Sequence, residues 1–285
     1  LHLSRGLGDV YKRQEYYDHP ESQKIIKELV EVHNFDPNYV ERVLKDARKQ
    51  QKIIDSISKP AEFTWTWDRY KKLFIEDKRI KNGKNFIQNN IKTLEKAEAE
   101  FGVPKEIIVA IMGIETRYGR IMGNYRVIDS LTTLGFDYPR RSKFFKDELV
   151  KYFLLTRENN LDILSVKGSY AGAMGYGQFI SSSYRAYAID FDGDGYVDLF
   201  NSIEDSIGSV ANYLKVHGWV RNGKIVTKSS LNNVRDIYKP HVSLSKFIPL
   251  SFNENGEDIY FIGDDNFVAI TKYKRSHFYA MAVYY

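Results

Sequence analysis

The sequence contains no cysteine, and that absence removes several kinds of chemistry. Disulfide frameworks, cysteine nucleophiles and thiolate metal sites are excluded, whereas the compartment stays open because many exported proteins lack cysteine. Long apolar runs are also missing, since none approaches the roughly 18 residues that a membrane-spanning helix needs. The sequence has no clustered basic helix and no recognised nucleic-acid motif, so nucleic acid is not an expected partner.

What is present is the composition of a folded globular protein. The chain has 285 residues, of which 43% are hydrophobic, and this length suits one large domain or two modest ones. Its formal net charge of +5 suits an acidic polymer of some kind but is too small to name one. Tyrosine and phenylalanine are plentiful, at 21 and 17 residues, but such rings serve sugar stacking, base stacking and ordinary cores alike.

The first fourteen residues, LHLSRGLGDVYKRQ, differ in texture from the amphipathic segments that follow. No apolar stretch comes after their basic residues, so they do not form a signal peptide. We interpret residues 1–14 as a non-native leader that stands where an export signal or lipid anchor would be.

Helical periodicity dominates the chain up to residue 218. Amphipathic patterns are found in residues 15–58, 70–102 and 147–157, and a helix over 203–217 is expected with Ser202 as N-cap and Gly218 as its stop. From residue 219 to about 273, short β-type runs alternate with Asn-Gly and Gly-Asp-Asp turns, which predicts a small antiparallel sheet. The apolar residues 276–285 are expected to pack back onto the core.

Glu115 is the strongest candidate for catalysis. It lies near the end of a helix that is predicted to begin at Pro104 and stop at Gly119, and it follows Ile111 by four residues on the apolar side. Burial there would raise the pKa of the carboxyl group, so that it could hold a proton near neutral pH as a general acid must. The alternative is a helix-end glutamate paired with Arg117 or another arginine, because structural ion pairs also perturb pKa values.

Residues 190–198, with the sequence DFDGDGYVD, follow the start of an EF-hand calcium loop. Oxygen ligands fall at alternate positions and a glycine occupies the sixth position, where the loop turns sharply. The candidate ligands are Asp190, Asp192, Asp194 and the carbonyl of Tyr196. The alternative is an acidic turn that holds no metal.

The end of this loop departs from the EF-hand pattern. The twelfth position is Asn201, where a bidentate glutamate is usual, so a stretched loop would have to reach Asp205. Asp205 also fits a capping box, because it follows Ser202 by three residues. A calcium ion bound here would be structural, since nothing in the loop resembles an open catalytic position.

Residues 167–179, with the sequence KGSYAGAMGYGQF, are rich in glycine and other small residues. The segment lacks the Gly-Lys-Ser/Thr ending of a phosphate loop. Small residues allow the backbone to approach either a ligand or a neighbouring helix closely, and helix packing is the commoner reason. Gln178 is its most notable polar group, since an amide both donates and accepts hydrogen bonds.

Together these segments resemble the lytic murein transglycosylase B family, periplasmic enzymes of Gram-negative bacteria that cleave peptidoglycan. The resemblance covers residues 67–285 and rests on GIETRYGR at 113–120, FDYPRR at 136–141, GSYAGAMGYGQF at 168–179, DGDG at 192–195, ANY at 211–213 and YAMAV at 279–283. It implies an α+β fold: a helical domain at 15–100, a lysozyme-like core at 101–220, a small β domain at 221–272 and a return to the core at 273–285.

The resemblance also implies roles for individual residues. Glu115 would be the single catalytic acid, and the calcium loop would take its last ligand from Asp205. The substrate-binding positions would be Tyr70, Arg140, Arg141, Ser169, Gln178, Phe179, Tyr213, Tyr273 and Tyr279. The chain departs from the family pattern at Ser182, where proline is usual, and at Lys274, where asparagine is usual, and the second departure bears on the role of Tyr273.

The implied reaction needs one carboxyl group. Glu115 would protonate the glycosidic oxygen and then take the proton of the C6 hydroxyl, which closes on C1 to give a 1,6-anhydro sugar. A lysozyme-type hydrolase and a non-catalytic peptidoglycan-binding protein are the alternatives. Structural Ca²⁺ is the only cofactor expected, with no organic cofactor. The protein is expected to act as a monomer in the periplasm, with a lipid anchor in the outer membrane as one arrangement.

Overall fold

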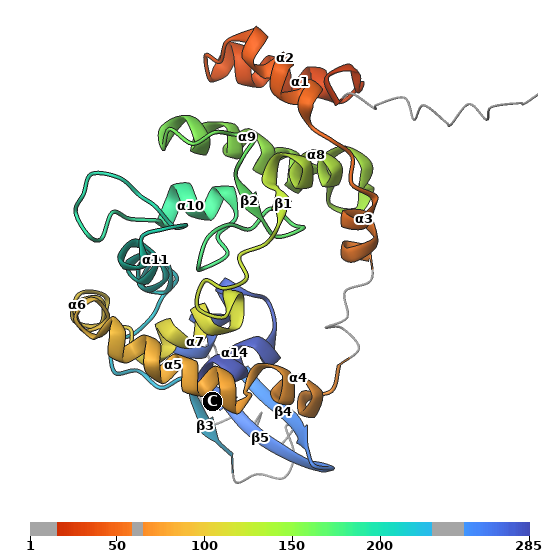
Figure 1. Cartoon of the computed structure of the whole chain (residues 1–285). Helices are drawn as coiled ribbons and strands as arrows, with labels where there is room; N and C mark the ends of the chain where they lie inside the picture. The colour runs from red at the N-terminus through yellow and green to blue at the C-terminus, as the bar shows by residue number, and fades with distance from the viewer. Residues whose placement is uncertain (1–15, 59–64, 230–247) are drawn as a thin grey trace, which may run out of the picture. The chain divides into compact units, whose positions relative to one another are not determined.

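The computed structural model describes residues 16–58, 65–229 and 248–285 (Figure 1). This part of the chain is mostly helical with small antiparallel sheets, so the expected α+β class is confirmed. The interpretation of residues 1–14 as a leader, and the part of the expected β domain at 230–247, lie outside the described residues.

The chain forms two compact units, and both are discontinuous in sequence. The first combines residues 1–58 with 125–172, and the second combines 59–124 with 173–285. The boundaries expected at residues 100 and 220 therefore do not coincide with those of the units. Glu115 belongs to the second unit.

The first unit is built around the helices α8 (Val127–Asp137) and α9 (Ser142–Glu158), which pack against each other (Figure 1). Arg126 ties this pair to the N-terminal helices, because its guanidinium lies 2.6 Å from Asp46 and 2.7 Å from Asp129. Its other elements are η1 (Tyr16–Asp18), α1 (Ser22–Lys27), η2 (Glu28–Val32), α2 (Pro37–Asp46), α3 (Gln51–Ser58), η4 (Pro139–Arg141) and the paired strands β1 (Tyr125–Arg126) and β2 (Lys167–Gly168).

The second unit surrounds α7 (Lys105–Thr116), the helix that carries Glu115. Contacts link α7 with α5 (Asp77–Asn89), α6 (Ile91–Phe101), α11 (Ile203–Val216) and α14 (His277–Tyr284). Ile107, Ile108 and Ile111 are buried, as their helical spacing predicts, whereas Ile114 is partly exposed. Among the described residues, the remaining helices of the unit are α4 (Trp67–Phe74), α10 (Ser181–Tyr187) and α13 (Asp265–Tyr273).

The predicted antiparallel sheet is present in the second unit. Its order is β3–β5–β4, formed by β3 (Val226–Lys228), β5 (Glu257–Gly263) and β4 (Ile248–Glu254). Asn255 and Gly256, both with positive φ, form the tight turn between β4 and β5, as their sequence predicts.

One part of the β prediction is wrong, because residues 265–273 form the helix α13. Phe267 and Ile270 lie three residues apart and are both fully buried, which is a helical spacing. Asp264 and Asp265 therefore mark the start of a helix, where negative charge is favourable, rather than a turn between strands.

Two helix ends illustrate how local sequence sets the boundaries. α11 begins after Ser202, whose hydroxyl accepts the Asp205 N–H at 3.0 Å as predicted. α7 begins at Lys105 and ends at Thr116, so it is shorter at both ends than the predicted helix, which starts at Pro104 and ends just before Gly119. Its early end follows from Arg117, which takes a left-handed conformation with φ of 52°.

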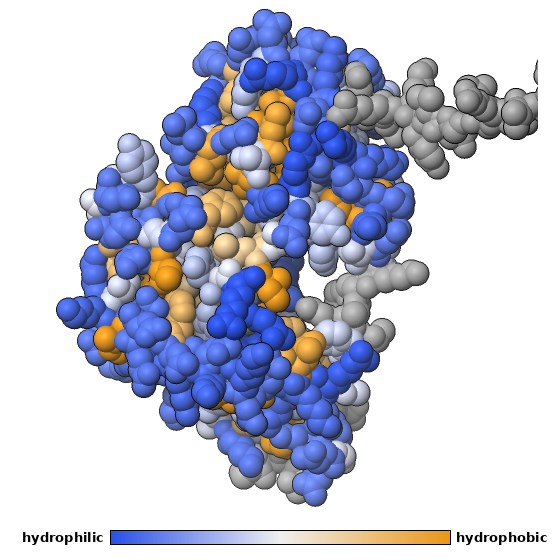
Figure 2. All heavy atoms as spheres, viewed as in Figure 1, coloured by the Kyte–Doolittle hydropathy of each residue, from blue (hydrophilic) through white to orange (hydrophobic). Residues whose placement is uncertain are grey.

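No helix among the described residues combines the length and the apolar character that crossing a membrane would require. Hydrophilic side chains interrupt the apolar ones over the face seen in Figure 2.

Candidate active site

Glu115 lies in the last turn of α7 and is partly exposed. The chain leaves the helix sharply after it, since Arg117, Tyr118 and Gly119 all have positive φ values. Such a run is costly for residues with a Cβ, so surrounding contacts must hold it. Arg117 pairs with Glu76 over 3.0 Å, which gives this arginine a carboxylate partner other than Glu115.

Tyr118 is one of the contacts that hold the turn. Its hydroxyl donates to the carbonyl oxygen of Arg79 on α5 at 2.9 Å. A Cβ at Gly113 would lie 2.6 Å from this hydroxyl, so a glycine is required there for the ring to pass across α7. The result is a rigid connection between α5 and the end of the helix that carries Glu115.

Aromatic side chains predicted to bind substrate gather in the same unit. Phe179, Tyr213 and Tyr273 form a mutually contacting cluster, with ring centroids 4.8–5.9 Å apart. Tyr279 on α14 extends it, because its ring stacks on Tyr273 with centroids 6.4 Å apart. The cluster thus brings together side chains from α11, α13, α14 and the glycine-rich loop.

Two tyrosines of the cluster are electrostatically linked to Glu115. Burial raises the pKa of both Tyr273 and Tyr279 well above the usual value, and the negative charge of Glu115 raises both further. Hydrogen bonding with Glu115 is a further cause of the raised pKa of Tyr279. Both phenols therefore stay neutral at physiological pH, where they act as hydrogen-bond donors and not as bases.

Backbone contacts fix the orientation of the cluster. The Tyr273 hydroxyl donates to the Gly177 carbonyl at 2.6 Å, and the Tyr213 hydroxyl donates to the Lys272 carbonyl at 2.8 Å. Burial also raises the pKa of Tyr213 to about 12. Lys274, which replaces the usual asparagine, places its ammonium 5.6 Å from the Tyr279 ring centroid. Tyr273 thus keeps a defined position in spite of this departure.

Gln178 adopts a left-handed conformation with φ of 53°. Its side-chain amide donates at 3.1 Å to the carbonyl oxygens of Met122 and Gly175. These bonds fold the glycine-rich loop against the segment that follows α7. The loop serves close packing as well, because a Cβ at Gly175 would lie 2.4 Å from the Leu199 carbonyl.

The other predicted substrate-binding residues fall in two places. Tyr70 is buried on α4 of the second unit among aromatic rings, including Phe278 and Trp67, and it acts electrostatically on Tyr279. Ser169, Arg140 and Arg141 belong to the first unit. Both arginines are exposed on η4, where the Arg141 guanidinium lies 4.2 Å from the Phe144 ring centroid.

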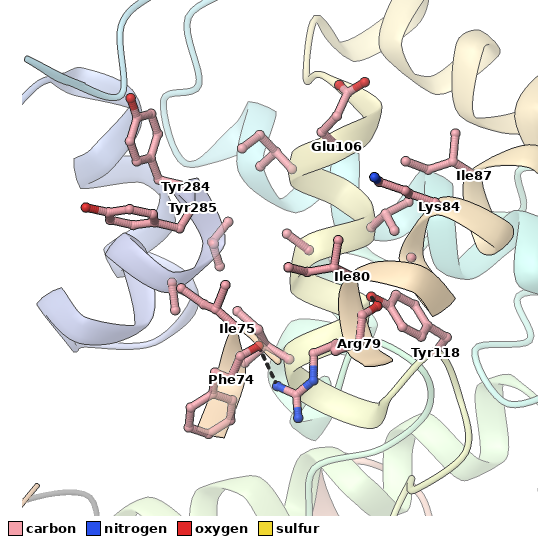
Figure 3. Close-up of a pocket in the computed structure, with 17 residues that line it drawn as sticks. Phe74, Ile75, Arg79, Ile80, Lys84, Ile87, Glu106, Tyr118, Tyr284 and Tyr285 are labelled. Carbon is pink, nitrogen blue, oxygen red and sulfur yellow. Dashed lines mark hydrogen bonds between the residues drawn. The ribbon is translucent and has the colours of Figure 1, made fainter. Parts of the chain in front are cut away.

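A pocket of about 230 Å³ opens beside a different face of α7 (Figure 3). Its walls are apolar side chains of α5, α7 and α14, such as Ile80 and Ile107, with Lys84 and Glu106 among its polar groups. Glu115 and the aromatic cluster do not line it. We therefore do not assign the catalytic site to this pocket.

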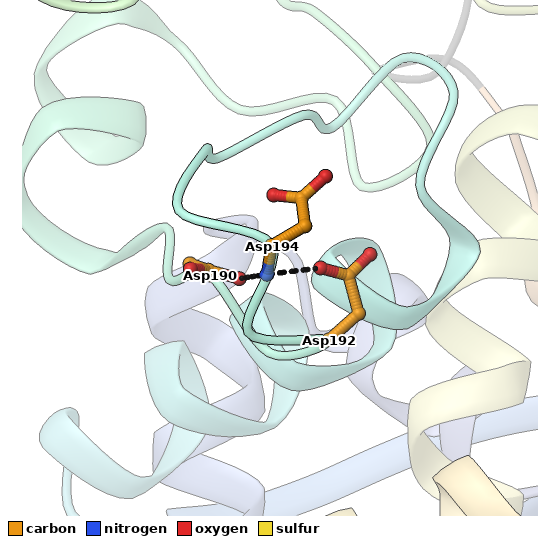
Figure 4. Close-up of side chains that lie close together, drawn as sticks. All are labelled: Asp190, Asp192 and Asp194. Carbon is orange, nitrogen blue, oxygen red and sulfur yellow. Dashed lines mark hydrogen bonds between the residues drawn. The ribbon is translucent and has the colours of Figure 1, made fainter.

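The acidic loop has the arrangement that the sequence predicts for its first three ligands. Carboxylate oxygens of Asp190, Asp192 and Asp194 lie within 4.8 Å of one another (Figure 4). Asp190 accepts the backbone N–H of Gly195 at 2.8 Å, and this bond is the largest cause of its lowered pKa. Three converging carboxylates repel one another, so this geometry favours a bound cation.

Within the part of the chain that the structure describes, Asp205 is not one of the carboxylates in this cluster. It is 1% exposed, and its carboxylate accepts backbone N–H groups of Phe191 at 2.7 Å and Asp198 at 2.8 Å. Asp205 thus joins the two ends of the loop, while burial raises its pKa. The Tyr196 side chain is 71% exposed, which leaves only its backbone carbonyl as a candidate ligand.

Thr116 is a site residue that sequence reasoning missed. It is 1% exposed and follows Glu115 directly. Its hydroxyl lies 2.9 Å from the Tyr176 carbonyl, to which it donates, and accepts the Gly119 N–H at 2.9 Å. The only local signal was a hydroxyl residue buried at a helix end, which is too common to single out.

Comparisons with known proteins identify the family of the chain. A family model described as Transglycosylase SLT domain matches residues 18–285. The membrane-bound lytic murein transglycosylase B of Escherichia coli (strain K12) is 37% identical over 298 residues, covering 95% of this chain and 82% of the relative.

Solved structures of lytic transglycosylases match the fold as well. The soluble lytic transglycosylase SltB1 from Pseudomonas aeruginosa is 42% identical with a TM-score of 0.87, covering 93% of this chain and 96% of that one. The Escherichia coli lytic transglycosylase Slt35 in complex with calcium is 37% identical with a TM-score of 0.84, covering 94% and 91%. The chain therefore belongs to the SLT-domain transglycosylases and is a peptidoglycan-cleaving lyase like these relatives.

Proposed function

We propose that Glu115 is the single acid–base group of a reaction that cleaves the β-1,4 bond between N-acetylmuramic acid and N-acetylglucosamine and leaves 1,6-anhydro ends. The observation that carries the proposal is the electrostatic contact of Glu115 with the buried phenols Tyr273 and Tyr279. These residues come from three separate helices, and all three were expected at the substrate from the family resemblance.

The proposed reaction uses one carboxyl group twice, first as an acid and then as a base. Protonated Glu115 donates to the glycosidic oxygen as the bond from C1 breaks, and the N-acetyl oxygen of muramic acid stabilises C1 as an oxazolinium ion. Glu115, now ionised, takes the proton of the C6 hydroxyl, whose oxygen bonds to C1. No water is consumed, and the intramolecular attack gains much of its rate from proximity. Retaining hydrolases instead use two carboxyl groups about 5–5.5 Å apart.

The neutral phenols fit this scheme. The Tyr279 hydroxyl, which stays protonated, can donate to Glu115 when it is ionised or to an acetamido oxygen of the sugar, whereas the Tyr273 hydroxyl donates to Gly177. Gln178 and the rings of Phe179 and Tyr213 would line the cleft and restrict the sugar, as the family resemblance implies. By the family resemblance, Ser169, Arg140 and Arg141 would also bind substrate, with the arginines directed at carboxylates of the peptide stem.

We also propose that the loop of Asp190, Asp192 and Asp194 holds a structural calcium ion, with the Tyr196 carbonyl and Asp205 as further ligands. The converging carboxylates support it, and so does the calcium complex of Slt35. Bound calcium would neutralise the carboxylates and rigidify the loop. We assign it no step in the reaction and propose no organic cofactor.

Peptidoglycan as substrate makes the periplasm of a Gram-negative bacterium the proposed place of action. Attachment to the outer membrane by a lipid is part of this proposal, because the Escherichia coli relative is named membrane-bound. We propose that the protein acts as a monomer, since the proposed groups all come from one chain.

Product analysis tests the reaction. Purified peptidoglycan is digested with the protein, and the muropeptides are weighed by mass spectrometry. We expect products lighter by one water than those of a hydrolase, and none from Glu115→Gln. Glu106→Gln, which removes a charge from the first turn of the same helix, is the control and should retain activity. Hydrolytic products, or turnover by Glu115→Gln within tenfold of wild type, would refute the proposal.

A further inference from the structure

An open pocket of about 870 Å³ lies in the first unit, and none of the site residues named above lines it. Residues 34–43 form one wall, where η2 ends and α2 begins, and residues 156–164 form the other, where α9 ends. Its volume is within the range of about 300–1,000 Å³ that is usual for pockets that bind small organic ligands.

Phe35 and Tyr39 line this pocket as an aromatic platform, and the Arg42 guanidinium lies 5.4 Å from the Tyr39 ring centroid. Phe35 is buried and Tyr39 half-buried, and their rings are nearly parallel, with an interplanar angle of 12° and centroids 6.1 Å apart. Phe153 contacts both rings edge-on from the core, and the Arg157 guanidinium lies 4.1 Å from the centroid of Phe35. These contacts fix the platform before any ligand arrives, which lowers the entropy cost of binding.

Polar groups around the platform are available to a ligand. The side chains of Asn34, Arg42 and Asn160 and the Tyr39 hydroxyl make no hydrogen bond or ion pair with another residue in the part of the chain that the structure describes. Together they offer amide and guanidinium donors and amide and phenol acceptors.

The two asparagines are held in place by the backbone. Asn34 and Asn160 have φ values of 55° and 51°, and each follows the end of a helix. A left-handed asparagine is an ordinary way to end a helix, so strain is not the argument. What matters is that two helix ends converge on one pocket and each presents an amide there.

The charges of the pocket select the class of ligand. Arg42 and Arg157 balance Asp36 and Asp162, so the lining has no net charge and does not favour a polyanion. An aromatic platform that carries an arginine over each ring and is ringed by amides, a phenol and balanced charges suits a neutral ligand with many hydroxyl or amide groups. A pyranose ring with an N-acetyl group has this character.

We propose that this pocket is a second saccharide site that binds one or two N-acetylhexosamine units of a glycan strand. The choice of N-acetylhexosamine rests on the proposed function, whereas the saccharide class rests on the pocket itself. A second contact with the same polymer makes rebinding intramolecular, so the enzyme stays on the strand between cleavage events.

The test measures binding without cleavage. Isotope-labelled Glu115→Gln full chain is titrated with chitotetraose, and backbone amide shifts are followed by NMR. We expect shifts for residues 34–43 and 156–164. The double substitution Asn34→Gly and Asn160→Gly should weaken binding at these amides about fivefold or more, since two neutral hydrogen bonds are lost. Glycine favours positive φ, so the fold should persist.

A matched control shares the backbone chemistry but not the pocket. Asn222→Gly and Asn255→Gly change two other asparagines with positive φ, at 59° and 53°, and should leave binding unchanged. The proposal is overturned if saturating chitotetraose leaves the pocket amides unmoved, if both double variants bind alike, or if only free stem peptide shifts these amides. Failure of the product analysis would leave this binding result standing, so the two proposals fail separately.

Discussion

The hydroxyl of Thr116 donates to the main-chain carbonyl of Tyr176 across 2.9 Å, and this bond joins the helix end beside Glu115 to the glycine-rich loop. The Tyr176 N–H in turn donates to the Leu199 carbonyl at 3.0 Å, at the end of the acidic loop. The candidate acid is thus connected through one buried hydroxyl to the loops that carry Gln178 and the aspartates.

Thr116→Val should lower kcat about 10- to 100-fold while KM changes little, because it removes this bond without changing the shape of the side chain. It should also reduce the free energy of unfolding by about 1–3 kcal/mol, since the Tyr176 carbonyl loses its buried donor. Thr116→Ser keeps the hydroxyl and should restore kcat to near the wild-type value. Equal kcat in the valine and serine variants would show that the hydroxyl does not position Glu115.

Glu115→Gln should lower the pKa values of Tyr273 and Tyr279, because both are raised in part by the negative charge of Glu115. Burial is the larger cause and stays, so both pKa values should remain above the usual value near 10. NMR of tyrosine labelled with ¹³C at the ring carbon bearing the hydroxyl measures the titrations, and Tyr273→Phe and Tyr279→Phe assign the signals. Unchanged titrations would place Glu115 too far from the phenols for the proposed site.

Tyr213 should make the free energy of unfolding depend on pH in the alkaline range. Its pKa in the folded state is about 12, which is above the unfolded value near 10. The neutral form is therefore favoured by folding, so its contribution is complete below pH 10 and is lost as the pH rises toward 12. Between these limits, the Tm of Tyr213→Phe should fall less steeply than that of the wild type. Parallel curves would mean that Tyr213 titrates normally in the folded protein.

Features that depend on neighbouring residues could be predicted from the sequence, whereas features that depend on tertiary packing could not. The start of α11 and the β4–β5 turn were predictable because Ser202 and the Asn255-Gly256 pair act on their immediate neighbours. Helix α13 was missed because its turn-like start and β-type residues are local signals too, and burial of Phe267 and Ile270 outweighs them. Propensity is a weak guide where packing decides.

The residues of the candidate site also differ in whether the local sequence predicts them. Glu115 could be singled out from the spacing of its own helix. No local pattern predicts that Tyr273 and Tyr279 meet it, since the three residues lie on α7, α13 and α14, and these tyrosines were named only through family resemblance. The left-handed Arg117 and Tyr118 were equally hidden, because non-glycine residues rarely adopt that conformation.

Calcium should raise the Tm of the metal-stripped protein without being required for cleavage. At about 100 times its dissociation constant, a ligand that binds only the folded state stabilises it by roughly 2.7 kcal/mol. Asp190→Asn should remove most of this shift, because it neutralises one of the three converging carboxylates. Asp147→Asn, on an exposed helix surface, is the control and should keep the shift. An identical melting curve in calcium and in chelator would remove the ion from the proposed function.

Replacing Arg140 and Arg141 by alanine should raise KM for peptidoglycan that bears peptide stems and leave KM for stem-free glycan nearly unchanged. Both guanidiniums are exposed on η4, where they could pair with stem carboxylates, and Arg141 is in addition held against Phe144. The difference in KM between the double variant and the wild type should become smaller as salt is added, because screening weakens the arginine–carboxylate pairs of the wild type. Lys143→Ala controls for the loss of positive charge, since this lysine is 89% exposed and lies two residues further along the chain. If the control raises KM as much as the double variant does, the effect is one of general charge, and carboxylate recognition has to be sought at other residues.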